Sequence, residues 1–150
     1  MKIKIDQQLS PHFNLKEFVN SDTARKLGID NTPTLRDIAN LRELCVRILE
    51  PLRDFIGEPI KITSGYRCPR LNKAVGGVAT SAHIVGFAAD IKPTKSTMKD
   101  FKAKVLDFFT KTDIPFDQVI DEKAGRSVWV HIGLKNLAGK QRKEIFKITK

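Results

Sequence analysis

The spacing of apolar residues divides the chain into a helical first third and a strand-rich remainder. Across residues 35–52 apolar side chains recur at intervals of three and four, which predicts one long amphipathic helix. Thr34 and Asp37 supply a capping box at its start, and Gly57 ends it. Pro51 has no amide hydrogen, so we expect it to kink or end this helix.

Two shorter helices and one later helix are predicted from the same signals. Asn14 with Glu17 three residues later forms a second capping box, and Ser21 and Gly28 bracket a short helix between them. The later helix covers residues 97–112, "TMKDFKAKVLDFFTKT". Its inward face comprises Phe101, Val105, Phe108 and Phe109.

The remaining apolar segments read as strands. "GFAADIKP" is short and almost continuously apolar, which is typical of a buried strand. "FDQVIDE" and "SVWVHIGL" predict a hairpin that turns at Ala124-Gly125. "PIKITSGYR" and "EIFKI" predict two more strands, and "PRLNKAVGG" a short helix or turn. Helices followed by a mainly antiparallel sheet indicate an α+β fold.

Length and composition fit one domain over residues 1–150. The 150 residues are 41% hydrophobic and 29% charged, as in an ordinary globular protein. No apolar run approaches the ~20 residues of a membrane span, and the N-terminus lacks an apolar signal segment. We therefore expect a monomer that is synthesised in the cytoplasm without a signal peptide. Cys45 and Cys68 are too few for a disulfide framework, so we read both as free thiols.

A formal net charge of +10 points to an anionic partner or to a solvated basic face. Nucleic acid, a phosphate-rich polymer and acidic cell-wall material all carry the required negative charge. The chain has no aromatic-interleaved basic stripe and no recognition-helix motif, so a nucleic-acid partner is not favoured. An anionic cell-wall polymer remains as a candidate.

The segment "TSAHIVGFAAD" carries the first candidate chemistry. His83 precedes the buried strand, Asp90 lies within it, and His131 lies on a separate strand. Singly, these residues are often a loop histidine, a cap and a half-buried histidine. Together they have the nitrogen and oxygen donors of a zinc site, and three protein ligands leave a position for water, as in catalytic zinc sites.

"SGYRCPRLNKAVGG", "SAHIVGFAAD" and "WVHIGL" together resemble the zinc D-Ala-D-Ala peptidases of bacteria and phages. That group includes carboxypeptidases and L-Ala-D-Glu endopeptidases. Its S-x-H-x-x-G-x-A-x-D pattern is complete here, as Ser81, His83, Gly86, Ala88 and Asp90. The first half also resembles the small, single-domain, phage-encoded branch. The resemblance implies a hedgehog/DD-peptidase-like fold, in which helices pack on the sheet that carries the zinc.

The resemblance also implies roles for individual residues. His83, Asp90 and His131 would ligate zinc. Arg67 would grip the substrate and stabilise the developing oxyanion, which suits a fixed guanidinium. Ser81 would hydrogen-bond the substrate backbone. Other roles are a surface ion pair for Arg67 and a local turn cap for Ser81.

The general base is the one role that does not transfer directly. Better-known relatives have a carboxylate three residues before the last zinc histidine, where this chain has Val128. Glu122 matches a glutamate of the small branch and is our first choice, with Asp121 and Asp117 as alternatives.

Strand register bears on that choice. A hairpin about Ala124-Gly125 would pair Gln118 with His131 and leave Glu122 on the same face, four residues or roughly 13 Å along the strand. A bulge would then have to close the gap.

The resemblance implies a zinc metallopeptidase that hydrolyses an amide bond in peptidoglycan stem peptides, as a D,D-carboxypeptidase or an endolysin-type endopeptidase. The missing acid before His131 leaves a non-catalytic, zinc-containing cell-wall peptide-binding module as the alternative. We expect action at the cell wall, after phage-mediated release or as a virion component.

Overall fold

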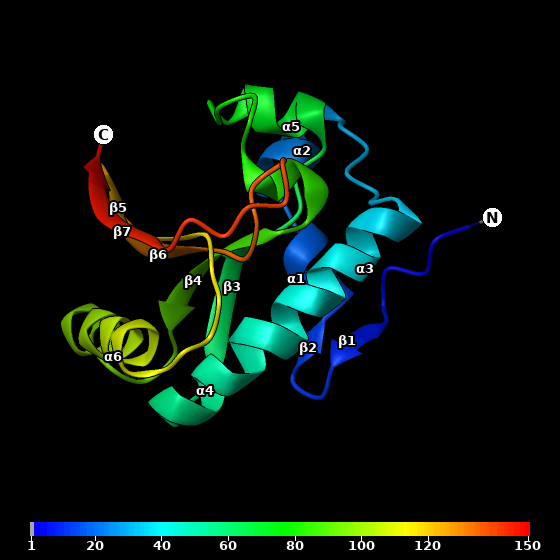
Figure 1. The fold of residues 1–150 in the computed structure, drawn as a ribbon. Coiled ribbons are helices and arrows are strands. Elements are labelled where there is room, and N and C mark those ends of the chain that lie inside the picture. The colour runs from blue at the N-terminus through cyan, green and yellow to red at the C-terminus, as the bar shows by residue number, and fades with distance from the viewer. Residues whose placement is uncertain (1) are drawn as a thin grey trace.

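The computed structural model of the protein describes residues 2–150. Its helices are concentrated in the first half and most of its strands in the second (Figure 1). In chain order the elements are β1 (Gln8–Ser10), β2 (Phe13–Asn14), α1 (Leu15–Val19), α2 (Asp22–Leu27), α3 (Leu35–Leu44), the π-helix η1 (Cys45–Leu49), α4 (Glu50–Ile56), β3 (Ile60–Ser64), α5 (Pro69–Ala74), the 3-10 helix η2 (Ala82–Val85), β4 (Ala88–Pro93), α6 (Met98–Lys111), β5 (Gln118–Ala124), β6 (Ser127–Gly133) and β7 (Glu144–Thr149).

The main sheet has five strands in the order β3-β4-β6-β5-β7. All neighbours are antiparallel except β5 and β7, which run parallel. Helix α6 packs on β4 and β6, and α1 packs on β3. The strands β5, β6 and β7 reach away from the main group of helices at one edge of the molecule (Figure 1). The α+β prediction is confirmed.

One apolar core joins the helical half to the sheet. Leu41 and Ile48 from the helices, Ile91 and Ile132 from the strands and Phe101 from α6 are all fully buried in it. The predicted inward face of α6 is confirmed, since all four of its residues are buried. Both predicted capping boxes are also present, at Asn14 and at Thr34.

The long helix does not end at Pro51 but at Gly57, the residue predicted to close it. The chain continues from α3 through η1 into α4, and the helix ends at Gly57 in a left-handed conformation with φ of 81°. The π turn ends at Leu49, two residues before the proline. A locally wider turn tolerates the loss of the hydrogen bond that proline cannot donate, so the helix continues past Pro51.

The β5–β6 hairpin forms as expected, but its predicted register is wrong by two residues. Ala124 pairs with Ser127, so the turn is Gly125-Arg126, with φ of 60° at Gly125. A two-residue turn with positive φ only at its first position favours glycine there, which places Gly125 one position earlier in the turn than we predicted. Glu122 consequently pairs with Trp129.

Three features had no counterpart in the prediction. The β1–β2 hairpin precedes the first helix, η2 follows the "VGG" segment, and β7 pairs in parallel with β5. Each of the first two is too short to give a periodic pattern. Within residues 2–150, no helix combines the length and the apolar character that crossing a bilayer requires.

Candidate metal centre

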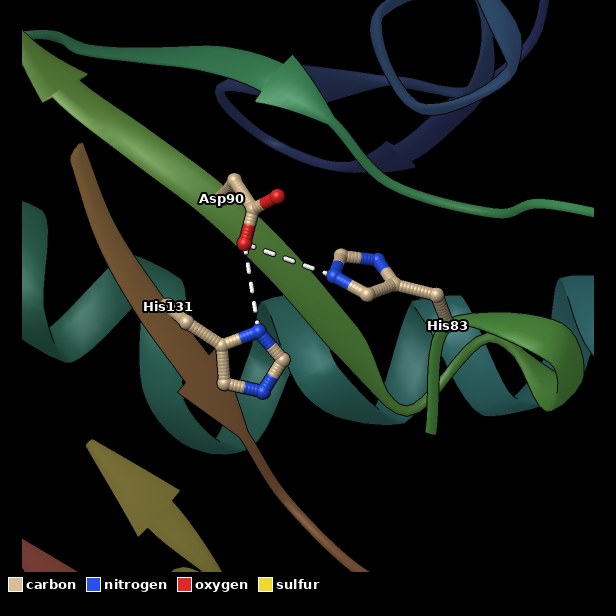
Figure 2. Close-up of side chains that lie close together, drawn as sticks. All are labelled: His83, Asp90 and His131. Atoms are coloured by element: carbon tan, nitrogen blue, oxygen red, sulfur yellow. Dashed lines mark hydrogen bonds and ion pairs between the residues drawn. The ribbon is translucent and has the colours of Figure 1, made fainter. Parts of the chain in front are cut away.

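Strand pairing brings two of the three candidate ligands together. Asp90 on β4 is the direct cross-strand partner of His131 on β6. His83 lies in η2, immediately before β4, and its ring points back toward Asp90 (Figure 2). The three side chains therefore converge from three elements, and all three are buried.

Their separations fit a single metal ion. Asp90 Oδ1 lies 3.3 Å from His83 Nε2 and 3.1 Å from His131 Nδ1 (Figure 2). Bonds of ~2.0 Å at tetrahedral angles place neighbouring zinc ligands roughly 3.3 Å apart. All three ligand atoms lie within 4.8 Å of one another. Two imidazoles and one carboxylate are also a donor set that zinc accepts.

One of the small residues between the ligands, Gly86, allows a close contact with a helix. A Cβ on Gly86 would lie 2.6 Å from the backbone oxygen of Asp37 in α3, and Gly86 itself has φ of 83°. Only glycine fits both conditions. Ala88 and Ala89, which start β4, are fully buried. We predicted that these residues let the chain pass close to a metal, and this stays a prediction. Gly86 in addition lets the turn before β4 press against α3.

A backbone carbonyl orients His83. The oxygen of Gly65 lies 2.6 Å from His83 Nδ1, so Nδ1–H donates to it and Nε2 faces Asp90 with its lone pair free. Gly65 is held in turn by Phe18, because a Cβ on Gly65 would lie 2.6 Å from Cβ of Phe18. Helix α1 thus holds in place the carbonyl that orients His83.

The electrostatics of the centre favour metal-binding protonation states. Burial lowers the pKa of His83 and so keeps its imidazole neutral. Burial alone would raise the pKa of Asp90, but the adjacent His83 and His131 outweigh it and hold that pKa below its usual range. Neutral imidazoles with an ionised carboxylate are the forms that bind a cation.

Arg67 lies beside the centre without an ion pair among the described residues. Burial lowers its pKa, while Asp90 and Glu122 act in the opposite direction. Its Nε is buried and has no hydrogen-bond partner within residues 2–150. A surface ion pair therefore does not account for this arginine, which lines the cavity over the centre.

Asn31, which no sequence motif singles out, fixes the backbone on both sides of Arg67. Its Nδ2 donates to the carbonyls of Val19 and Tyr66 at 3.0 and 3.1 Å, and its Oδ1 accepts from the backbone N–H of Cys68 at 2.8 Å. The sequence "IDNTP" reads as a turn. Bonds to partners 12 to 37 positions away leave no local pattern, so only the fold reveals this role.

Ser81 has the local role that we weighed for it. Its Oγ accepts from the backbone N–H of His83 at 3.2 Å and so caps η2. The same side chain lines the cavity over the centre. A bond from Ser81 to substrate stays a prediction.

The three candidate acids differ in their partners. Asp121 Oδ1 pairs with Lys102 Nζ at 2.5 Å, on the sheet face that α6 covers. Asp117 accepts three hydrogen bonds from Arg142, at 2.8 to 3.0 Å. Glu122 has no such partner among the described residues and lines the cavity.

The observed register also brings Glu122 closer to the centre than we expected. Ile120 pairs with His131, so Glu122 lies only two residues farther along the same face. No bulge is needed. Burial, and then the charge of Asp90, raise the pKa of Glu122.

The three candidate ligands, Arg67, Ser81 and Glu122 all line one cavity of about 580 Å³. A comparison with protein families shows the family to which the chain belongs. The family model described as Peptidase M15 matches residues 11–132, which include every candidate ligand. The chain belongs to the M15 peptidase family. A comparison with curated proteins finds no match. M15 members are zinc peptidases, and the His-Asp-His centre fits that metal.

Zinc should bind this M15 peptidase with one ion per chain. At a free zinc concentration 100-fold above Kd, the free energy of unfolding should rise by about 2.7 kcal/mol, because the ion binds only the folded ligand set. His83→Ala should weaken zinc binding by more than about 100-fold. Loss of a residue that only hydrogen-bonds a metal ligand already lowers metal affinity by up to about 100-fold, and loss of a ligand should cost more. Calorimetry and thermal denaturation measure both effects.

His12 supplies the matched control. It is the remaining histidine, is exposed and bonds Glu50 away from the centre. His12→Ala should bind zinc like the wild type. Equal zinc affinity in His83→Ala and the wild type would contradict the assignment.

Asn31→Ala should cost roughly 2–4 kcal/mol of unfolding free energy, because this buried side chain would lose three hydrogen bonds. If Asn31 acts mainly through Arg67, kcat/KM should fall while zinc affinity is retained. Denaturation, zinc calorimetry and peptidase kinetics separate these effects, with the exposed Asn20→Ala as control. Loss of zinc binding together with activity would show that Asn31 supports the whole centre.

Proposed function

We propose that this M15 peptidase is a zinc enzyme that hydrolyses an amide bond in peptidoglycan stem peptides, as a D,D-carboxypeptidase or an endopeptidase. One observation carries the proposal. The three buried ligands share a single cavity with a guanidinium and a carboxylate that have no ion-pair partner within residues 2–150. These are the groups that metal-assisted amide hydrolysis requires.

Each group has a defined task in this reaction. Bound zinc supplies a Lewis acid and lowers the pKa of a coordinated water to ~7. Glu122 accepts the proton that water loses on attack, and then donates it to the departing amine. Its raised pKa suits both directions of transfer. Arg67 donates to the oxygen on which negative charge develops.

A peptide-binding module without catalysis is the second candidate. It is favoured by Val128, which occupies the position three residues before His131 where many relatives have an acid. Glu122 favours catalysis, because β5 presents a carboxylate on the same sheet face as the ligands. The basic charge of +10 suits an anionic cell wall, which we propose as the place of action for either candidate.

The zinc-loaded protein should release soluble peptides from purified sacculi. A chelator should abolish release, and added zinc should restore it, because the three ligands alone do not activate water. Mass spectrometry of the fragments identifies the bond that is cut. Release that continues unchanged in the chelator would rule out zinc-dependent hydrolysis.

Glu122→Gln should lower kcat by about 10²–10⁴-fold, the usual contribution of a general base. Zinc affinity should be unchanged, since Glu122 is not a ligand. Asp121→Asn is the matched control, because Asp121 lies next in the chain but bonds Lys102 on the opposite face. Full activity of Glu122→Gln would assign the base elsewhere.

A further inference from the structure

The last strand of the chain forms one side of the catalytic cavity. The M15 match ends at residue 132, yet five later residues line the same cavity as the metal ligands. We call these residues the C-terminal wall: Asn136, Arg142, Phe146, Ile148 and Lys150. Three of them come from β7 or directly follow it.

Strand register places β7 in line with the metal centre. Asp90 pairs with His131, His131 with Ile120, and Ile120 with Phe146. These four side chains form one row across β4, β6, β5 and β7. Strands lie ~4.8 Å apart, so the row extends roughly 14 Å from Asp90 to the sheet edge. The next row pairs Glu122 with Ile148.

The far end of this row is apolar and open. Phe146 is 39% exposed although it lies on the cavity face of the sheet. Ile148, two residues on, is partly buried on the same face. Together with Ile120 they continue an apolar floor from His131 to the edge.

A cationic group lies beside that apolar end. The backbone N–H of Lys150 donates to the carbonyl of Lys123 at 2.8 Å, which fixes Lys150 next to β5. Its side chain has no ion pair in the part of the chain that the structure describes, and its charge acts on Glu122. By contrast, Arg142 is engaged by Asp117 and Glu144.

We propose that the C-terminal wall is a substrate subsite that selects extended, anionic peptides. The substrate would run from the metal centre over Ile120 to β7, with an apolar portion on Phe146 and Ile148 and a carboxylate beside Lys150. An extended chain covers ~3.4 Å per residue, so the row accommodates about four residues. This inference rests on the proposed peptidase function. It adds a preference for long peptides over dipeptides, determined by residues outside the matched family segment.

The decisive variant is Phe146→Ala, with Ile145→Ala as its control. Ile145 is the neighbouring residue, is 43% exposed and points to the opposite sheet face. The probes are stem-peptide fragments of two to five residues. In the zinc-loaded wild type, both kcat/KM and affinity by calorimetry should rise with length. Phe146→Ala should lose roughly tenfold of the affinity for the longest fragments and none for the dipeptide.

A second pair tests the charge. Lys150→Met should bind a carboxylate-bearing pentapeptide several-fold more weakly than the wild type does. It should bind derivatives of the same pentapeptide, in which the C-terminal or side-chain carboxylate is an amide, as tightly as the wild type does. Lys147→Met, on the opposite face of β7, should bind both like the wild type. These variants change exposed side chains, and a Tm equal to that of the wild type verifies folding.

The outcomes separate the subsite from the enzyme. If the wild type cleaves stem peptides but Phe146→Ala and Lys150→Met retain its affinity at every length, the subsite is refuted and the peptidase stands. If the zinc-loaded wild type neither binds nor cleaves any fragment, the peptidase function itself fails and the subsite with it. Length dependence lost only in the two wall variants supports the proposal.

Discussion

The pairing of β4 with β6 is the constraint on which the site depends. It makes Asp90 and His131 direct neighbours although they are 41 positions apart in the chain, and it leaves their ligand atoms 3.1 Å apart. Two ladders of backbone hydrogen bonds hold this geometry, because β6 is also paired with β5 along its full length. The position of the ligands is therefore a property of the sheet, and the packing of α6 beneath it keeps that sheet in place.

The second support of the centre comes from the N-terminal helices. Gly65 presents its carbonyl to His83 and contacts Phe18 of α1 so closely that no side chain could be added. Gly86 meets the backbone of α3 in the same way. Close helix–turn contacts of this kind require glycine at both positions. Through these contacts the helical half helps to position the candidate metal centre.

Most of the fold was predictable from short-range signals in the sequence. The features that were not predicted depend on long-range contacts. Capping boxes and the apolar period of α6 are short-range signals, and both led to the correct elements. The histidine–aspartate pattern is also short-range, and it indicated side chains that the fold brings together. The register of the hairpin depended on which turn position Gly125 takes, and one position there moved Glu122 by two residues relative to His131. The hydrogen bonds of Asn31 and the π turn before Pro51 depend on tertiary packing, which a short segment of sequence does not reveal.

The placement of β7 has a consequence for how such an enzyme can diversify. β7 contacts the ligand-bearing strands only through β5, and Asp117 ties the preceding connection down through Arg142. Mutations along this edge strand can therefore accumulate without moving the histidines or the aspartate. Under the proposed function, selection can change which substrates are bound while the metal centre stays constant, so specificity and reactivity are free to evolve separately.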